Sequence, residues 1–498
     1  MHDHPVIIGV GQITERHPDL DNPPHPLQLA LRAVHACIED TESADILDHI
    51  DMVSVVNMFT WLYKDPAGRL CEMLGINPPM KEYSTWGGNT PQWLVNRAAD
   101  MIAAGEIRAA LLVGAEAMYT TQSMRKKNSV PPWPHIENPV VDMIGDSRYG
   151  LSPHELLHKA EIPIHVYPLF ENAIRAERGL SIEEHRRWLG ELWADFSTVA
   201  SANPYAWFRD PLNSRDIYEV SEKNRMVGFP YTKLLNPILA VNQSAAVIIT
   251  GAKTAEKYSV PKKKRVFLHG GADATDKWFV SERVSYTFSP AIREAGNAAM
   301  EMAGAGVNQM DFFDLYSCFP CAVFIGAKSI GLDTNNLPPL TITGGLAYFG
   351  GPGNNYNMHA IACAVEKLRE NPGVFGYISG LGWYITKHSV GIYSGREPEK
   401  PWDRRGQGEI QQRIDRMIGP DLETSPRGPV TVETYTVMHN RGGDPDYAIV
   451  IGRLDSGERC WGLVVNDIEL FSAMETEEFV GKKGVIAPGD TSANTVTF

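Results

Sequence analysis

The feature that most constrains the fold is an alternation of continuous apolar runs with amphipathic segments, which extends from about residue 5 to residue 395. The run PVIIGVGQ is followed by HPLQLALRAVHACIEDT, and the run DMVSVVNMF by further helical sequence. Short, continuous apolar runs are typical of strands that are buried on both faces of a parallel sheet. The alternation therefore predicts βαβ units and an α/β fold.

The same order of elements occurs twice. In each half a strand, a helix and a second strand lead to a glycine turn that opens another helix. These turns are Gly87-Gly88 and Gly350-Gly351-Pro352-Gly353. The repetition predicts two related lobes. A polar, proline-rich loop region, about 120–235, interrupts the first, so the halves are placed at 1–255 and 256–395.

The chain changes character after these two halves. Residues 396–427 are polar and charged, as in a linker, and residues 428–498 contain short strands separated by turns such as RGGDPD and DSGE. This spacing predicts a separate, OB-like β-barrel module. Acidic residues outnumber basic ones in it, whereas tracking a single nucleic-acid strand needs a positive groove. We therefore expect no nucleic-acid partner.

Charge and composition exclude several further classes of function. The net charge of −14 repels nucleic acid and anionic membranes. No apolar run approaches the roughly 20 residues that a membrane span requires, and the sequence MHDHPVIIGVGQ lacks an apolar signal segment. A cytoplasmic protein is expected. Only Cys318 and Cys321 have a CxxC spacing, and a packed, reduced pair is favoured over zinc or redox chemistry, so no metal is expected.

Residues 84–105, STWGGNTPQWLVNRAADMIAAG, have the form of a binding or catalytic turn. Thr90 can cap a helix, Pro91 suits its first position, and Gly105 can end it. The N-terminus of such a helix directs backbone N–H groups and a positive dipole end at one point. The stretch nevertheless offers no Cys, no Ser–His pair and no Lys as a reagent.

Several blocks of the sequence together resemble the thiolase superfamily. They are GGNTPQWLVNRAADMIAAGEIRAALLVGAEAM, NPYAWFRDP, NQSAAVIITGA, DLYSCFPCAVF, TGGLAYFGGPGNNYNMHAIACAVEKLR and GYISGLGWYITKHSVGIYS. The resemblance covers about residues 5–395, and with its β-rich tail the whole chain is similar to thiolase-like proteins that carry an additional C-terminal domain. It implies a duplicated thiolase fold of two βαβαβαββ halves, layered α-β-α-β-α.

The resemblance also implies a ligand and a chemistry. Thiolases bind coenzyme A or acyl-CoA as a substrate, hold no permanent cofactor, and catalyse Claisen-type acyl transfer, as acetyl-CoA acetyltransferases do. They are usually dimers or tetramers, which favours a homodimer here. The thiolase nucleophilic cysteine falls on or next to Thr85, and the oxyanion-hole residue on Tyr316. The Gly-His-Pro histidine falls on Gly351, and the second cysteine near Ser379.

This substitution pattern removes the usual thiolase reagents. The chemistry needs a thiolate that takes the acyl group, a base that lowers its pKa, and N–H donors for the oxyanion. A threonine hydroxyl without a basic neighbour is a poor replacement for the thiolate, and Gly351 removes the imidazole. Conventional Claisen or thiolytic activity is therefore doubtful. Cys318 or Cys321 could replace the thiol only if one of them reached the same pocket.

Other residues near the altered blocks leave further functions open. Tyr316, Tyr348 and Tyr356 could act as general acids or bases, as in thiolase-related steroid side-chain aldolases, or could fill the space that the lost residues leave. His359 and His388 are further catalytic candidates, although a lone histidine is more often structural. Three functions remain open: an acyl-CoA-binding, acetyl-CoA acetyltransferase-like protein, a non-catalytic acyl-CoA-binding or scaffold protein, and a tyrosine-dependent retro-aldolase acting on acyl-CoA thioesters.

The expected acyl-CoA site lies between the loop region and the two glycine turns. Small residues let a backbone approach a ligand, and amides supply hydrogen bonds. The cations of the RKK run at 125–127 could hold phosphates. Against this, Trp86 is large enough to block a tunnel. The expected binding residues are Thr85, Trp86, Gly87, Gly88, Asn89, Arg125, Lys126, Gly350, Gly351, Asn354, Asn355 and Tyr356.

Overall fold

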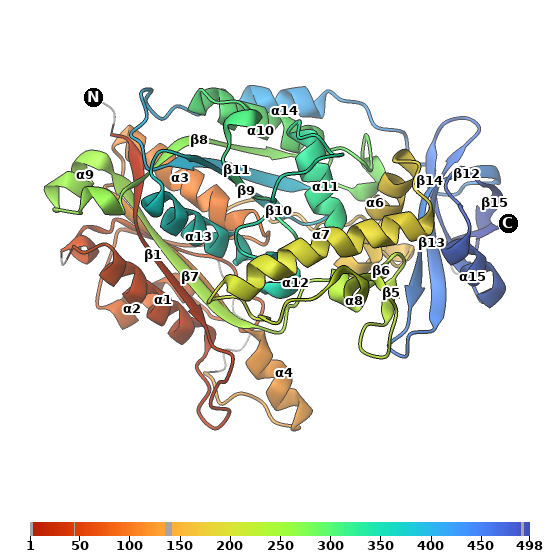
Figure 1. Ribbon diagram of the computed structural model, residues 1–498, viewed down its shortest axis with the longest axis horizontal. Coiled ribbons are helices and arrows are strands. Elements are labelled where there is room, and N and C mark those ends of the chain that lie inside the picture. The colour runs from red at the N-terminus through yellow and green to blue at the C-terminus, as the bar shows by residue number, and fades with distance from the viewer. Residues whose placement is uncertain (1–2, 44, 135–141, 490–492) are drawn as a thin grey trace.

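A computed structural model describes residues 3–43, 45–134, 142–489 and 493–498 (Figure 1). Small parts of the predicted first half, of its loop region and of the C-terminal module lie outside these ranges, namely residues 1–2, 44, 135–141 and 490–492. None of the helices in the described ranges combines the length and apolarity that crossing a bilayer requires.

The first half forms five strands of one sheet in the order β3-β2-β4-β7-β1. The β2 strand is parallel to β3 and β4, whereas β7 is antiparallel to β4 and β1. Nearly every residue of these strands is buried, as the continuous apolar runs predict. The strands are β1 (Pro5–Thr14), β2 (Met52–Val55), β3 (Met80–Tyr83), β4 (Ala109–Ala117) and β7 (Asn242–Gly251).

The second half repeats this order. Its four strands lie in the sheet order β8-β11-β10-β9. The first strand of this half, β8, thus pairs with the last, β11, and β10 separates β11 from β9. The first half has the same order with one more strand, β3, at its edge. Pairing of β1 with β8 joins both halves into nine strands. The strands are β8 (Val266–Thr275), β9 (Phe312–Asp314), β10 (Phe375–Gly382) and β11 (Lys387–Ser394).

Helices form three layers around these strands. The central layer contains α3 (Thr90–Ala104) and α13 (Tyr356–Glu370), which pack against each other and against strands of both halves. Outside the first half lie α1 (Pro26–Asp40) and α2 (Pro66–Leu74). Outside the second half lie α10 (Pro290–Ala303) and α11 (Pro320–Ser329). The duplicated fold and its α-β-α-β-α layering are confirmed.

The loop region supplies helices that lie between this core and the C-terminal strands (Figure 1). The long helix α7 runs beneath α11, and α6 contacts both α11 and β12. The helices of the loop region are α4 (Met118–Lys126), α5 (Pro153–Leu157), α6 (Pro163–Glu177), α7 (Ile182–Ala202) and α8 (Ser214–Tyr218). The remaining helices are α9 (Ala252–Lys257), α12 (Gly345–Tyr348), α14 (Gln407–Asp415) and α15 (Ile468–Thr476).

The C-terminal strands form a closed five-stranded barrel, which confirms the predicted β-barrel. Their order is β13-β14-β16-β15-β12, and β12 pairs with β13 to close it. The strands are β12 (Gly428–His439), β13 (Pro445–Leu454), β14 (Arg459–Val465), β15 (Lys483–Pro488) and β16 (Asn494–Thr497).

The barrel is integrated with the rest of the molecule. A short hairpin of the loop region, β5 (Met226–Gly228) and β6 (Tyr231–Thr232), extends its sheet through the pairing of Gly228 with Met438. The buried guanidinium of Arg459 forms an ion pair with Glu433 and donates hydrogen bonds to carbonyl oxygens of the core. The sequence pattern does not reveal this connection because strands of two or three residues have no detectable alternation.

Candidate functional site

The first glycine turn is packed too tightly for any side chain. A Cβ atom on Gly88 would lie 2.0 Å from the hydroxyl oxygen of Tyr316 and 2.6 Å from the carbonyl oxygen of Leu381. Gly87 adopts a φ of +149°, which side chains rarely allow. The α3 helix begins here with Asn89, not Thr90, as its N-cap, and ends at Gly105 with a φ of +75°, as predicted.

Asn354 joins the two glycine turns. Its Oδ1 accepts a hydrogen bond of 2.9 Å from the N–H of Gly87, and its Nδ2 donates one of 3.0 Å to the carbonyl oxygen of Asn57. The neighbouring Asn355 donates to the carbonyl oxygen of Gly114 at 2.8 Å. The structure thus brings together turns that are more than 260 residues apart, but it uses these amide donors to hold the scaffold.

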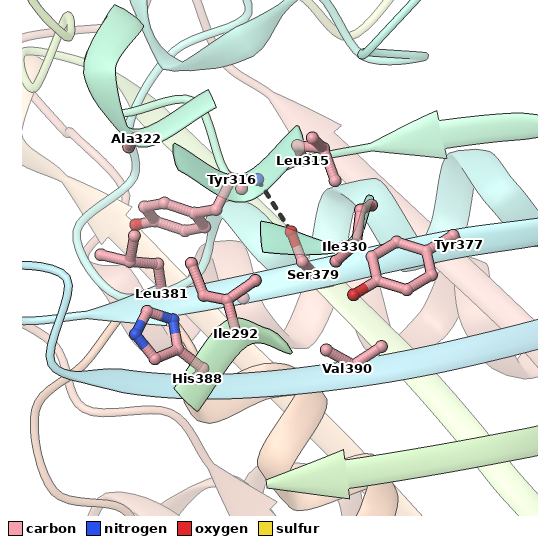
Figure 2. A pocket seen from close by; sticks show the side chains of 12 residues that line it. Ile292, Leu315, Tyr316, Ala322, Ile330, Tyr377, Ser379, Leu381, His388 and Val390 are labelled. Atoms are coloured by element: carbon pink, nitrogen blue, oxygen red, sulfur yellow. Dashed lines mark hydrogen bonds between the residues drawn. The ribbon is translucent and has the colours of Figure 1, made fainter. Parts of the chain in front are cut away.

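Two of the positions that the resemblance matches to thiolase catalytic residues, Tyr316 and Ser379, meet in a small cavity that we call the motif crossing, which Leu381 and His388 also line. The N–H of Tyr316 donates to Ser379 Oγ at 3.1 Å (Figure 2). The cavity has a volume of about 20 Å³ and is lined mostly by apolar side chains. A volume of that size holds about one water molecule. The structure therefore places Tyr316 and Ser379 together, but in a filled space.

The three candidate tyrosines are buried. Burial raises the pKa of Tyr316, Tyr348 and Tyr356 far above the usual range. The Tyr356 hydroxyl donates to Asp314 Oδ1 at 3.1 Å, and the Tyr348 hydroxyl donates to the carbonyl oxygen of Leu234 at 3.2 Å. A raised pKa makes a phenol a weaker acid, and hence disfavours the phenolate that a general base requires.

The two candidate histidines lie in different surroundings. His359, on α13, is fully buried; its Nδ1 lies 2.9 Å from Gln12 Oε1, and burial lowers its pKa to about 3. It lines neither the motif crossing nor the cleft described below. His388 borders the crossing, with Nε2 placed 3.2 Å from the carbonyl oxygen of Ile385 and 3.6 Å from Asp276 Oδ2.

A larger hollow, the α3 cleft, opens beside the N-terminus of α3. Its volume is about 200 Å³. Thr85 lies in its wall, with its N–H bonded to the carbonyl oxygen of Ile144 at 2.9 Å. The residues that line the cleft are Thr85, Asn89, Thr90, Trp93, Gly145, Asp146, Asp273, Ala274, Thr275, Lys387, His388 and Gln411.

Lys387 is a residue of this cleft that the sequence reasoning missed. Only 7% of it is exposed, and its Nζ donates to the carbonyl oxygen of Trp86, directly before the first glycine turn. Burial lowers its pKa to about 8, although Asp146 acts in the opposite direction. The detectable signal was Lys387 as the one Lys, Arg, Asp or Glu in the run KHSVGIYS, all of which is buried.

Other predicted residues lie outside both hollows. Arg125 and Lys126 are exposed at the end of α4 and line neither of them. Trp86 is half-buried and packs edge-on against Trp383, with ring centroids 6.4 Å apart.

The second glycine turn and the CxxC pair also lie outside the two hollows. Gly351 donates its N–H to the carbonyl oxygen of Ile238 at 2.8 Å, and a Cβ of Gly350 would meet Gln243. Cys318 and Cys321 are buried free thiols, whose pKa burial raises; neither lines the crossing.

Comparison with known proteins agrees with this architecture. Residues 409–491 match the family described as the thiolase-like protein type 1 additional C-terminal domain. No curated protein sequence matches the chain. Two solved structures share the fold at low identity. The structure titled "Ltp2-ChsH2(DUF35) aldolase" is 17% identical, with a TM-score of 0.60, over 79% of this chain and 98% of that chain. Acetyl-CoA acetyltransferase from Syntrophomonas wolfei is 13% identical, with a TM-score of 0.55, over 80% of this chain and 100% of that one.

A third solved structure matches over nearly the full length. It is a monomeric SCP2-thiolase-like protein type 1 from Mycobacterium smegmatis, 33% identical, with a TM-score of 0.86. The match covers 99% of each chain. That relative is described as monomeric, whereas the resemblance to thiolases in general favours a homodimer. On this full-length similarity, the chain belongs to the SCP2-thiolase-like protein type 1 family.

Proposed function

We propose that the protein binds an acyl-CoA thioester without forming an acyl-enzyme through a thiol. The observation that carries this proposal is the contrast between the two hollows. The motif crossing is filled by buried side chains such as Tyr316, whereas the neighbouring α3 cleft keeps a volume of about 200 Å³ beside the first glycine turn.

The residues of the motif crossing do not support thiolase chemistry. None of the described residues that line it is a cysteine. Thr85 lies in the cleft instead, and a threonine hydroxyl needs an adjacent general base to become a nucleophile. Loss of a covalent nucleophile removes orders of magnitude in rate. Acyl transfer through a covalent intermediate is therefore not part of the proposal.

A cation paired with a lining residue of the α3 cleft can contact anionic groups of a ligand. Arg148 is exposed and pairs with Asp146 at 2.6 Å, while its guanidinium lies 3.7 Å from the ring centroid of Trp278. Arginine is well suited to bidentate contacts with phosphate. Asn89 also lines the cleft, where its Nδ2 donates to Ser389 Oγ at 3.2 Å. Arg148 thus takes the role that the sequence suggested for Arg125 and Lys126.

Two alternatives remain distinct from this proposal. A scaffold protein of the same fold would bind no acyl-CoA at all. A retro-aldolase would need a tyrosine that loses its proton readily, and burial has the opposite effect on Tyr316. The raised pKa values therefore favour ligand binding over tyrosine-dependent cleavage of a carbon–carbon bond.

Isothermal titration calorimetry with coenzyme A and with acetyl-CoA tests the proposal on the full chain. We expect saturable binding with a dissociation constant of about micromolar order, typical of a small ligand in a partly polar cleft. Equal affinity for both ligands would indicate that the coenzyme A portion supplies the binding energy. If neither coenzyme A nor acetyl-CoA produced a heat of binding, the proposal would be contradicted and the scaffold favoured.

A further inference from the structure

The α3 cleft contains an amine that acyl-CoA binding does not require. Lys387 begins β11 and pairs in register with Thr275 of β8, so its backbone is fixed by the sheet. On its other side Lys387 pairs with Gly382 of β10, across a tight turn in which Trp383 and Ile385 adopt left-handed φ values of +55° and +58°. The lysine therefore enters the cleft from a rigid strand and not from a surface loop.

The contacts of the amine leave it available for chemistry. Within the described ranges, the only hydrogen-bond acceptor of Lys387 Nζ is the carbonyl oxygen of Trp86. A Cβ placed on Gly87 would lie 3.0 Å from Nζ, so the absence of a side chain there gives the amine its space. The cleft that it borders is open to a small molecule of matching size.

We propose that Lys387 is a nucleophile that captures a small aldehyde or ketone in the α3 cleft as an imine. Hydroxyl and amide groups of Thr85, Thr90 and Asn89 line the same cleft and can hydrogen-bond to a hydroxylated carbonyl compound. Asp146 and Asp273 also border it, and each is ion-paired with an arginine, Arg148 and Arg404 respectively.

The reaction balances without an added oxidant, reductant or co-reactant. The lone pair of Nζ forms the C–N bond while the carbonyl π bond opens, which gives a carbinolamine. The C–O bond then breaks, and the oxygen leaves as water with the two hydrogens of the amine. Asp146 borders the same cleft and can carry a proton from nitrogen to oxygen.

The electrostatic surroundings of Lys387 support the nucleophilic role. Burial lowers its pKa to about 8, Asp146 raises it and Arg148 lowers it, while His388 and Asp273 border the same cleft. With that pKa, about a quarter of the amine is neutral at pH 7.5, against about 0.1% for a lysine with the ordinary value. Only the neutral amine attacks a carbonyl carbon.

Reductive trapping tests this inference. The full-length protein is incubated with propanal or glyceraldehyde and sodium cyanoborohydride, and peptide mass spectrometry measures the labelling rate of each lysine. We expect Lys387 to be labelled about tenfold faster or more than the exposed Lys126, because of its larger neutral fraction. The rate should increase with pH, reach half of its maximum near pH 8, the pKa of Lys387, and level off at about one pH unit above that.

Three variants complete the test. Lys387→Met should lose the fast-labelled peptide, Lys387→Arg should lose it while keeping a cation in the cleft, and Lys126→Met should retain it. Uniform labelling of all lysines, or no label on Lys387, would overturn the inference. The test contains no coenzyme A, so its outcome is independent of the acyl-CoA proposal.

Discussion

The motif crossing and the α3 cleft share the imidazole of His388 but differ in how their space is used. At the crossing, a tyrosine ring and aliphatic side chains leave room for about one water molecule. At the cleft, polar groups and a lysine surround about 200 Å³. Neighbouring parts of one fold can therefore differ in whether a small molecule can enter, because side chains decide how much space the backbone leaves open.

The comparison also shows why the two hollows differ in chemistry. At the crossing, burial raises the pKa of Tyr316, which keeps its phenol neutral and inert. At the cleft, burial lowers the pKa of Lys387 to about 8, which makes its amine more reactive. The same physical effect, removal of a charged form from water, deactivates an acid in one place and activates a base in the other.

Truncation of the tyrosine at the crossing should give the largest effect. Tyr316→Ala would remove a buried ring that packs on Gly88 and Tyr356, and should lower the free energy of unfolding by about 3–5 kcal/mol. Tyr149→Ala, which truncates a half-exposed ring, should cost less than about 1 kcal/mol. Urea denaturation measures both. Equal, small losses would show that the crossing is not a packed core.

The pH dependence of stability tests the state of the amine in the cleft. The folded-state pKa of Lys387, about 8, is below its ordinary value of 10.5, so between these values the unfolded chain binds more protons and stability rises with pH. The free energy of unfolding of the wild type, minus that of Lys387→Met, should become more positive by about 2 kcal/mol from pH 7 to pH 9.5. The corresponding difference for Lys126→Met should stay flat. A flat difference at Lys387 would mean that its amine is solvated like that of a surface lysine.

Charge reversal of Arg148, which pairs with Asp146 of the cleft, tests where the phosphates of acyl-CoA bind. Arg148→Glu should weaken acetyl-CoA binding about tenfold, since it removes a charge-assisted hydrogen bond of about 1.5–3 kcal/mol. Arg125→Glu, on the exposed end of α4, should change affinity less than about twofold, as is usual for surface charges outside a site. Isothermal titration calorimetry measures the affinity of both variants for acetyl-CoA. The reverse ranking would move the ligand to the loop-region surface that the sequence suggested.

The smallest expected effect is the absence of an acyl adduct. Intact-mass spectrometry after incubation with acetyl-CoA should show no mass increase in wild type or in Thr85→Ala, because neither has an activated nucleophilic thiol in the crossing. An adduct on Cys318 or Cys321 would revive thiol chemistry. An adduct that disappears in Lys387→Met would instead place the thioester carbonyl beside that amine.

Much of the fold could be predicted from the sequence. The apolar runs predict the strands, and the repeated order predicts two related lobes, whose strand orders agree apart from the additional β3 of the first. The turn-separated strands after residue 428 predict the barrel. The attachment of β5 to that barrel could not be predicted, because Gly228 and Met438 are 210 residues apart and a three-residue strand has no pattern of its own.

For the candidate site, too, some features follow from the sequence and others only from the tertiary structure. The sequence by itself determined which residue types stand at the thiolase-like positions, and hence that Thr85 and Gly351 cannot supply a thiolate and an imidazole. Only the tertiary structure decided that Tyr316 fills the crossing, that Arg125 is remote from both hollows, and that Lys387 meets Trp86 across 301 residues. Burial, cavity volume and pKa depend on contacts between distant segments, and local sequence patterns contain no information about such contacts.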